Sequence, residues 1–155
     1  MSRERFAAET GVSRETLAGF DIYAALLEKW NRRINLVAPS TLPAIWDRHF
    51  LDSAQLWLDR PADLRSWADL GSGAGFPGLV IGLLARDAGL DLDLTLVEAD
   101  SRKAAFLRTA AQAVAVDARV EVARAEALAP LCADVISARA LAPLRRLMPL
   151  AVRHL

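Results

Sequence analysis

The sequence predicts an α/β fold with a doubly wound parallel sheet, preceded by a helical region. Three observations support this prediction. The stretch Trp67–Gly78 reads as a short apolar strand, a turn with glycines at alternate positions, and a helix start. From Arg65 onward, short apolar runs alternate with helical patterns, as in βαβ units. Each expected strand also ends in a polar or otherwise distinctive residue, at the sheet edge where open α/β sheets bind ligands.

Composition limits the alternatives. Apolar residues make up 54% of the 155 residues, which suffices for a substantial core in one or two small domains. The apolar runs are short and broken by charges, and no apolar stretch follows Met1–Arg5, so we expect no membrane span and no secretory signal. Cys132 is the only cysteine, which excludes an intramolecular disulfide, and we expect it in the core. These features suggest a cytoplasmic protein.

Residues 1–60 read as a helical region. Ser13 suits an N-cap, and apolar residues then recur every three or four positions as far as Ile34. A second helix is expected from about Pro43, with one apolar stripe formed by Trp46, Phe50, Ala54 and Trp57. Such stripes need a partner, so we expect residues 1–60 to pack against a second domain spanning 61–155.

The second domain is predicted to alternate strands with helices. The strands are expected at about 66–70, 92–97, 119–123 and 134–137, and the helices between them at about 77–88 and 101–114. A last helix would carry Leu141, Leu144, Leu147 and Leu150.

The glycine turn is the first candidate binding element. A dinucleotide fingerprint would place its third glycine where this chain has Phe76. The glycines here are Gly71, Gly73 and Gly75, preceded by Asp69, and this pattern resembles class I S-adenosylmethionine methyltransferases. Glycines let a ligand lie against the backbone. The alternative is a tight strand–helix connection without a ligand.

The other strand ends add candidate ligand contacts. Glu98 ends the second strand, where its carboxylate could accept hydrogen bonds from both ribose hydroxyls. Ala125 and Glu126 follow the third strand and would lie near a nucleoside base, and Arg139 follows the fourth. The alternative for Glu98 and Arg139 is an ordinary surface position.

Charged residues form further groups. The net charge is zero, yet basic residues gather at Lys29, Arg32 and Arg33, and again from Val135 onward, where Arg139, Arg145, Arg146 and Arg153 occur without an acid. Such clusters either hold phosphates or form a solvated face. Arg48, His49 and Asp52 share one face of the second expected helix. They either edge the ligand pocket or form an ion pair beside a packed histidine.

Four stretches, 48–53, 69–78, 97–107 and 135–140, resemble the successive motifs of one family, the bacterial small-subunit ribosomal RNA (guanine-N7) methyltransferases, also called glucose-inhibited division protein B. The resemblance runs from about residue 20 to the end. One departure is Arg102-Lys103, where the family often has two lysines.

The resemblance implies a Rossmann-like class I sheet with strand order 3-2-1-4. Since that sheet has seven strands, we expect this chain to be incomplete at its C-terminus. It also implies S-adenosyl-L-methionine as cofactor, with contacts from Gly71, Phe76, Ala125, Glu126 and Arg139 and with Glu98 as the ribose acid. The implied reaction methylates N7 of guanosine 527 in 16S ribosomal RNA, either naked or within the small subunit. We further expect no metal and a monomer.

Guanine N7 has a free lone pair, so this chemistry needs positioning rather than a general base. Arg139 is therefore expected as a positioning residue that holds the methionine carboxylate, an RNA phosphate or guanine O6. RNA contacts are expected from Lys29, Arg32, Arg33, Arg145 and Arg146. Two alternatives stay open: a methyltransferase acting on a small molecule or protein, and a non-catalytic nucleotide-binding module.

Overall fold

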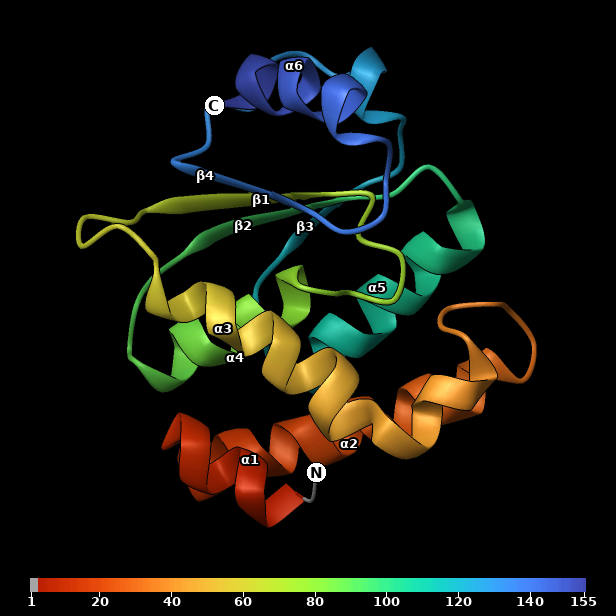
Figure 1. Ribbon diagram of the computed structural model, residues 1–155, viewed down its shortest axis with the longest axis vertical. Coiled ribbons are helices and arrows are strands. Elements are labelled where there is room, and N and C mark those ends of the chain that lie inside the picture. Colours follow the sequence, from red (N-terminus) through yellow and green to blue (C-terminus); the bar gives the residue numbers. More distant parts are fainter. Residues whose placement is uncertain (1–2) are drawn as a thin grey trace.

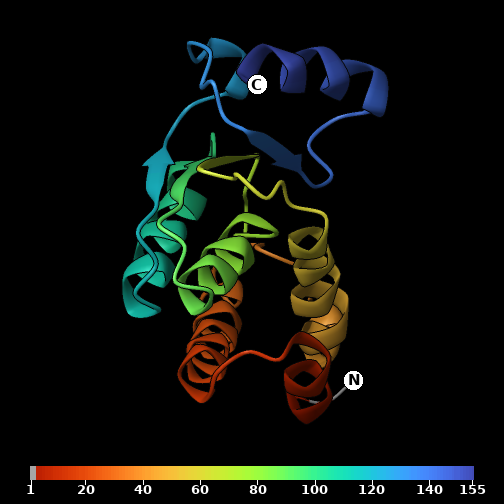
Figure 2. The same cartoon turned by 90° about the vertical axis from the view of Figure 1, so that its left-hand side faces the viewer.

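The computed structural model describes residues 3–155 as a four-stranded parallel sheet with helices on both faces (Figures 1 and 2). The strand order is β3-β2-β1-β4, which confirms the predicted α/β fold. The strands are β1 (Ser66–Leu70), β2 (Asp93–Val97), β3 (Arg119–Glu121) and β4 (Val135–Ala138). Leu70 is level with Val97 on one side and with Ala138 on the other. The carboxyl ends of three strands therefore meet at one edge of the sheet.

Two helices connect the first three strands on one face. They are α4 (Gly78–Asp87) and α5 (Ser101–Ala113), and α6 (Leu144–His154) covers the opposite face, as Figure 2 shows. The side chain of Asp100 caps α5 by accepting hydrogen bonds from the backbone N–H groups of Arg102 and Lys103. Both connecting helices begin soon after the carboxyl end of the preceding strand.

The N-terminal part forms a layer of helices on the same side of the sheet as α4 and α5 (Figure 1). It contains α1 (Arg3–Thr10), α2 (Arg14–Asn31), the 3₁₀ turn η1 (Pro39–Ala44), the π-helical turn η2 (Trp46–Leu51) and α3 (Asp52–Leu58). The expected N-cap is present, since the Ser13 hydroxyl accepts from the Thr16 N–H at 3.1 Å. Phe20 and Tyr23 of this layer belong to the same buried cluster as Leu83 and Phe106 of the sheet layer. The division into two domains stays a prediction, because a single core joins both parts.

The N-terminal helices differ from the predicted ones at two places. The helix expected to reach Ile34 ends at Asn31, whose Oδ1 accepts hydrogen bonds from the N–H groups of Leu36 (2.9 Å) and Val37 (3.0 Å). This side chain holds the following loop and ends the helix. The second expected helix is not uniform: it passes through 3₁₀ and π geometry before α3 begins at Asp52.

Two expectations about the C-terminal part were wrong. Leu141 precedes α6, so the helix carries only three of the four expected leucines, and Leu144 among them is 70% exposed. Leu150 of α6 packs against a small buried cluster made of Leu70, Val97 and Ala125. Cys132 is exposed rather than in the core.

Within residues 3–155, no helix combines the length and the apolar character needed to cross a membrane.

Candidate functional site

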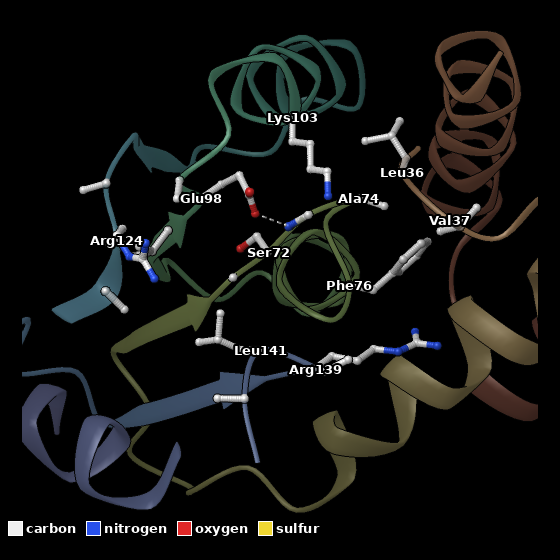
Figure 3. Close-up of a pocket in the computed structure, with 18 of the residues that line it drawn as sticks. Leu36, Val37, Ser72, Ala74, Phe76, Glu98, Lys103, Arg124, Arg139 and Leu141 are labelled. Atoms are coloured by element: carbon white, nitrogen blue, oxygen red, sulfur yellow. Dashed lines mark hydrogen bonds between the residues drawn. The ribbon is translucent and has the colours of Figure 1, made fainter. Parts of the chain in front are cut away.

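A cavity of about 870 Å³ opens at the carboxyl ends of the strands (Figure 3). All four strand ends contribute to it, together with the loop after α2 and the segment that leads into α6. Its lining includes Leu36, Val37, Ala38, Thr41, His49, Gly71, Ser72, Gly73, Ala74, Phe76, Glu98, Lys103, Arg124, Ala125, Glu126, Arg139, Leu141 and Arg146. The topology therefore brings residues from distant parts of the chain to one concave site.

The glycine turn forms the floor of this cavity. Gly71 (φ +69°) and Gly73 (φ +54°) adopt left-handed backbone angles that side chains beyond glycine rarely adopt. Between them, the N–H of Ser72 donates to the carbonyl of Val97 at 2.9 Å, which ties the turn to the end of β2. A Cβ on Gly73 would meet only the Gly71 carbonyl oxygen, at 3.9 Å. The backbone at Gly73 is therefore open to a ligand.

Glu98 holds the turn from the neighbouring strand. Its Oε2 accepts from the Gly73 N–H at 2.8 Å, as the dashed line in Figure 3 shows, and its Oε1 accepts from the Asp100 N–H at 3.1 Å. The side chain is largely buried but lines the cavity. Because each carboxylate oxygen has a second lone pair, Glu98 can still accept hydrogen bonds from a ligand.

Asp69 lies beneath the turn and is absent from the cavity lining. Its Oδ1 accepts from the Ser137 hydroxyl (2.7 Å) and its Oδ2 from the Gly78 N–H (3.1 Å), while the Trp67 indole N–H donates to Ser137 (2.8 Å). The side chain is fully buried, and this burial raises the pKa of Asp69 to about 6. Asp69 thus joins β1 to β4 and to the start of α4.

An aromatic stack borders the opposite side of the cavity. The rings of His49 and Phe76 are stacked, with centroids 4.8 Å apart and 15° between their planes. The Thr41 hydroxyl donates to the Ala38 carbonyl at 2.7 Å, so it accepts a hydrogen bond from His49 Nε2 at 2.8 Å. Burial, followed by the charge of Arg139, lowers the pKa of His49 to about 4. His49 is therefore neutral near pH 7 and carries its proton on Nε2.

Arg139 stands between this cavity and a smaller one of about 470 Å³. Its guanidinium donates to the Arg48 carbonyl at 3.4 Å and lies 4.0 Å from the Asp52 carboxylate. Its Cζ is 5.8 Å from the ring centroid of Phe76. Arg48 and Asp52 line the smaller cavity, whereas His49 lines the larger one. The three residues expected at the pocket edge are thus divided between the two cavities.

Most of the predicted cofactor contacts come together in the larger cavity. Asp69, buried beneath the turn, and Gly75 are exceptions. A Cβ on Gly75 would lie 2.5 Å from the Tyr23 hydroxyl oxygen, so this glycine packs against α2. Of the expected RNA contacts, Arg146 lines the cavity. The lining does not include the others, namely Lys29, Arg32, Arg33 and Arg145. The roles of all these residues stay predictions.

Sequence reasoning missed part of the cavity wall. Residues 36–38 lie in the loop after α2 and form one side of the site together with Thr41. Lys103 and Arg124 also line the cavity, and each follows closely after a strand end. The available signal was their place in the sequence: Lys103 lies five residues after Glu98, and Arg124 directly precedes Ala125. Among residues 3–155, no group of three or more His, Cys, Asp or Glu side chains could hold a metal ion.

Comparison with known proteins assigns this arrangement to a family. The family described as rRNA small subunit methyltransferase G matches residues 16–155. The chain belongs to this family. It is 50% identical over 155 residues to Ribosomal RNA small subunit methyltransferase G of Cereibacter sphaeroides (strain ATCC 17029), covering 100% of this chain and 75% of that protein. It is 53% identical over 150 residues to the protein of that name from Rhodospirillum centenum, covering 97% and 67%.

A third relative, from Paramagnetospirillum magneticum, is 50% identical over 155 residues and carries the same name. The match to rRNA small subunit methyltransferase G spans the turn, the strand ends and the residues of the aromatic stack. Membership in a methyltransferase family implies a methyl donor. The cavity at the glycine turn is the place in this fold where such a ligand is expected.

Proposed function

We propose that this chain transfers a methyl group from S-adenosylmethionine to N7 of guanosine 527 in 16S ribosomal RNA. One observation carries the cofactor assignment: the backbone of Gly73 opens onto the cavity, and the Glu98 carboxylate is fixed beside it by the Gly73 N–H. Family membership supports methyl transfer to the small-subunit RNA, since its relatives are named for that activity. The specific atom and nucleotide rest on the motif resemblance.

The residues present suit S-adenosylmethionine, which when bound supplies an electrophilic methyl group on a sulfonium. The open backbone at Gly73 allows close approach of the ligand. Glu98 would accept hydrogen bonds from the ribose hydroxyls, and Ala125 and Glu126 would border the base. Arg139 would pair with the methionine carboxylate, the only anionic group of the cofactor.

The acceptor side of the cavity suits an N7 nucleophile. Guanine N7 attacks through its lone pair and loses no proton, so the protein has to position the base rather than deprotonate it. The stacked rings of His49 and Phe76 give this side a flat aromatic border. Because His49 is neutral near pH 7, it adds no positive charge opposite the sulfonium.

The rim can meet the phosphates of the RNA. The cavity lining contains four basic side chains and two carboxylates. The basic ones are Lys103, Arg124, Arg139 and Arg146, and the acidic ones are Glu98 and Glu126. Cations at the mouth of a site attract a polyanion, and the affinity of such binding falls as the salt concentration rises. The cavity is therefore suited to a nucleotide within an RNA chain.

A methyl-transfer assay tests the proposal. Small ribosomal subunits and deproteinised 16S RNA, both from cells that lack the modification, are incubated with the protein and methyl-labelled S-adenosylmethionine. We expect label in RNA, and N7-methylguanosine after digestion to nucleosides. RNA with adenosine at position 527 serves as the matched control and should stay unlabelled.

Three results would contradict the proposal in different ways. Label on another atom of guanine would refute the N7 assignment alone. Label in a protein or small molecule but not in RNA would indicate a different substrate class. Calorimetry without any heat of S-adenosylmethionine binding would point to a non-catalytic module.

A further inference from the structure

The end of α6 contacts the wall of the cavity through two side chains. His154 is fully buried, and its Nε2 lies 2.9 Å from the carbonyl oxygen of Ala125. In the same turn of the helix, Arg153 donates to the Leu128 carbonyl at 2.8 Å. Ala125 is the first residue of η3 (Ala125–Ala127) and Leu128 directly follows it; this short 3₁₀ turn carries Ala125 and Glu126 into the cavity lining.

The contact also runs through the backbone. The Ala133 N–H donates to the carbonyl of His154 at 2.9 Å, so the segment after η3 is held at the same point. Nearby, Leu150 of α6 packs together with Leu128 and Leu131 against a small buried cluster that contains Ala125, Leu70 and Val97. The η3 wall is therefore built against the last turns of α6.

The chemistry of the histidine is defined by its partner. A carbonyl oxygen can only accept, so Nε2 carries the proton and donates it to Ala125. The Nδ1 atom is buried and has no hydrogen-bond partner among the described residues. A buried histidine with one of its nitrogens unpaired is costly, so the bond to Ala125 has to compensate for part of that cost. Neither the cofactor contacts nor the RNA contacts use this residue.

We infer that His154 is a positioning residue for the cofactor base: by donating to the Ala125 carbonyl, it fixes the η3 wall on which the adenine of S-adenosylmethionine rests. This inference depends on the proposed function. His154 lies behind the wall and does not touch the ligand. The affinity for the cofactor should nevertheless depend on whether the side chain at position 154 can donate a hydrogen bond to Ala125. The effect should act on the adenosine part of the ligand alone.

Side-chain reach provides the test. In His154→Gln, the amide nitrogen can occupy the place of Nε2, whereas the shorter side chain of His154→Asn reaches only the place of Nδ1. We expect the Asn variant to bind S-adenosylmethionine and free adenosine about two- to tenfold more weakly, by the same factor for both, as the loss of one neutral hydrogen bond predicts. The Gln variant should bind nearly as well as wild type. In turnover, the KM for the cofactor should rise while kcat stays unchanged.

Two controls separate this role from simple destabilisation. Leu27→Ala removes a buried side chain from α2, in the main core and away from η3, and should lower the melting temperature without changing the adenosine affinity. Val152→Ala removes an exposed side chain beside His154 and should change neither quantity. Affinities are measured by calorimetry well below each melting temperature.

The outcomes are distinct. If wild type binds neither ligand, the proposed function fails. If wild type binds and the Asn variant binds equally well, His154 plays no part in positioning the wall. If the Gln and Asn variants weaken binding equally, the hydrogen bond to Ala125 does not carry the effect and the inference is overturned. If kcat falls while KM is unchanged, His154 acts on the reaction rather than on the base wall.

Discussion

Asp69 and His49 are both buried, and their pKa values shift in opposite directions because burial favours the neutral form of each side chain. Burial raises the pKa of Asp69 from 3.8 to about 6, so the folded state binds its proton more tightly than the unfolded state. Its contribution to stability is therefore present at low pH and is lost as the pH rises from about 4 to 6. Burial lowers the pKa of His49 from 6.5 to about 4, so its contribution is lost as the pH falls through that window.

The two contributions should offset one another between pH 4 and 6, and single variants should separate them. In His49→Gln, we expect the free energy of unfolding to fall less on acidification from pH 6.5 to 4 than in wild type. In Asp69→Asn, it should fall less than in wild type as the pH rises from 4 to 6. Urea unfolding at a series of pH values measures both. Parallel curves for wild type and either variant would contradict the corresponding pKa shift.

Glu98 combines two tasks, because it holds the turn at Gly73 and faces the cavity. Glu98→Ala should weaken S-adenosylmethionine binding by roughly 1.5–3 kcal/mol, the typical loss for hydrogen bonds to a charged group, which is about ten- to a hundredfold in affinity. Calorimetry measures the change. Glu15→Gln, on the exposed side of α2, is the control, and wild-type affinity in Glu98→Ala would remove Glu98 from the site.

At the scale of elements, the glycine turn allows a strictly matched comparison. Gly73 and Gly89 both have positive φ, and a Cβ has room at either position, but only Gly73 lines the cavity. Valine should strain the backbone at both sites to a similar extent. We expect Gly73→Val to abolish S-adenosylmethionine binding and Gly89→Val to lower only the melting temperature. Equal loss of binding in both would assign the effect to backbone strain alone.

The elements of the sheet layer could be predicted because their signals are local. The expected strand 66–70 agrees with β1, and the end expected for the second strand, at Val97, is observed. The N-terminal layer was harder, since nothing in the spacing of Trp46 and Phe50 distinguishes a π-helical turn from an α-helix. The same applies to Leu36 and Val37, whose place in the cavity wall depends on the Asn31 side chain and on α2 packing against the sheet layer.

At the scale of the whole molecule, the distribution of charge should determine how the protein responds to salt. Arg146 lines the cavity and Arg145 is exposed beside it on α6. Replacing both with alanine should weaken RNA binding for every sequence and reduce the slope of log affinity against log salt by about one unit per lost phosphate contact. Filter binding at several salt concentrations measures the slope.

The control for this experiment lies at the opposite edge of the sheet. Arg119 begins β3 and is paired with Asp93 at 3.4 Å, away from the carboxyl ends of the strands. Arg119→Ala should leave the slope unchanged. If the double variant of Arg145 and Arg146 also keeps the wild-type slope, these arginines belong to a solvated face.

The core shared by the N-terminal helices and the sheet layer has a consequence for synthesis on the ribosome. Phe20 and Tyr23 emerge first, yet their partner Phe106 follows about eighty residues later. At roughly 5–20 residues per second, these aromatic faces stay without their native cover for several seconds. Nascent chains arrested before residue 113 should therefore be cleaved readily within α2, and longer ones should resist the protease. Protease resistance of the shorter nascent chains would contradict this expectation. It would show that the first sixty residues fold before the sheet layer has been synthesised.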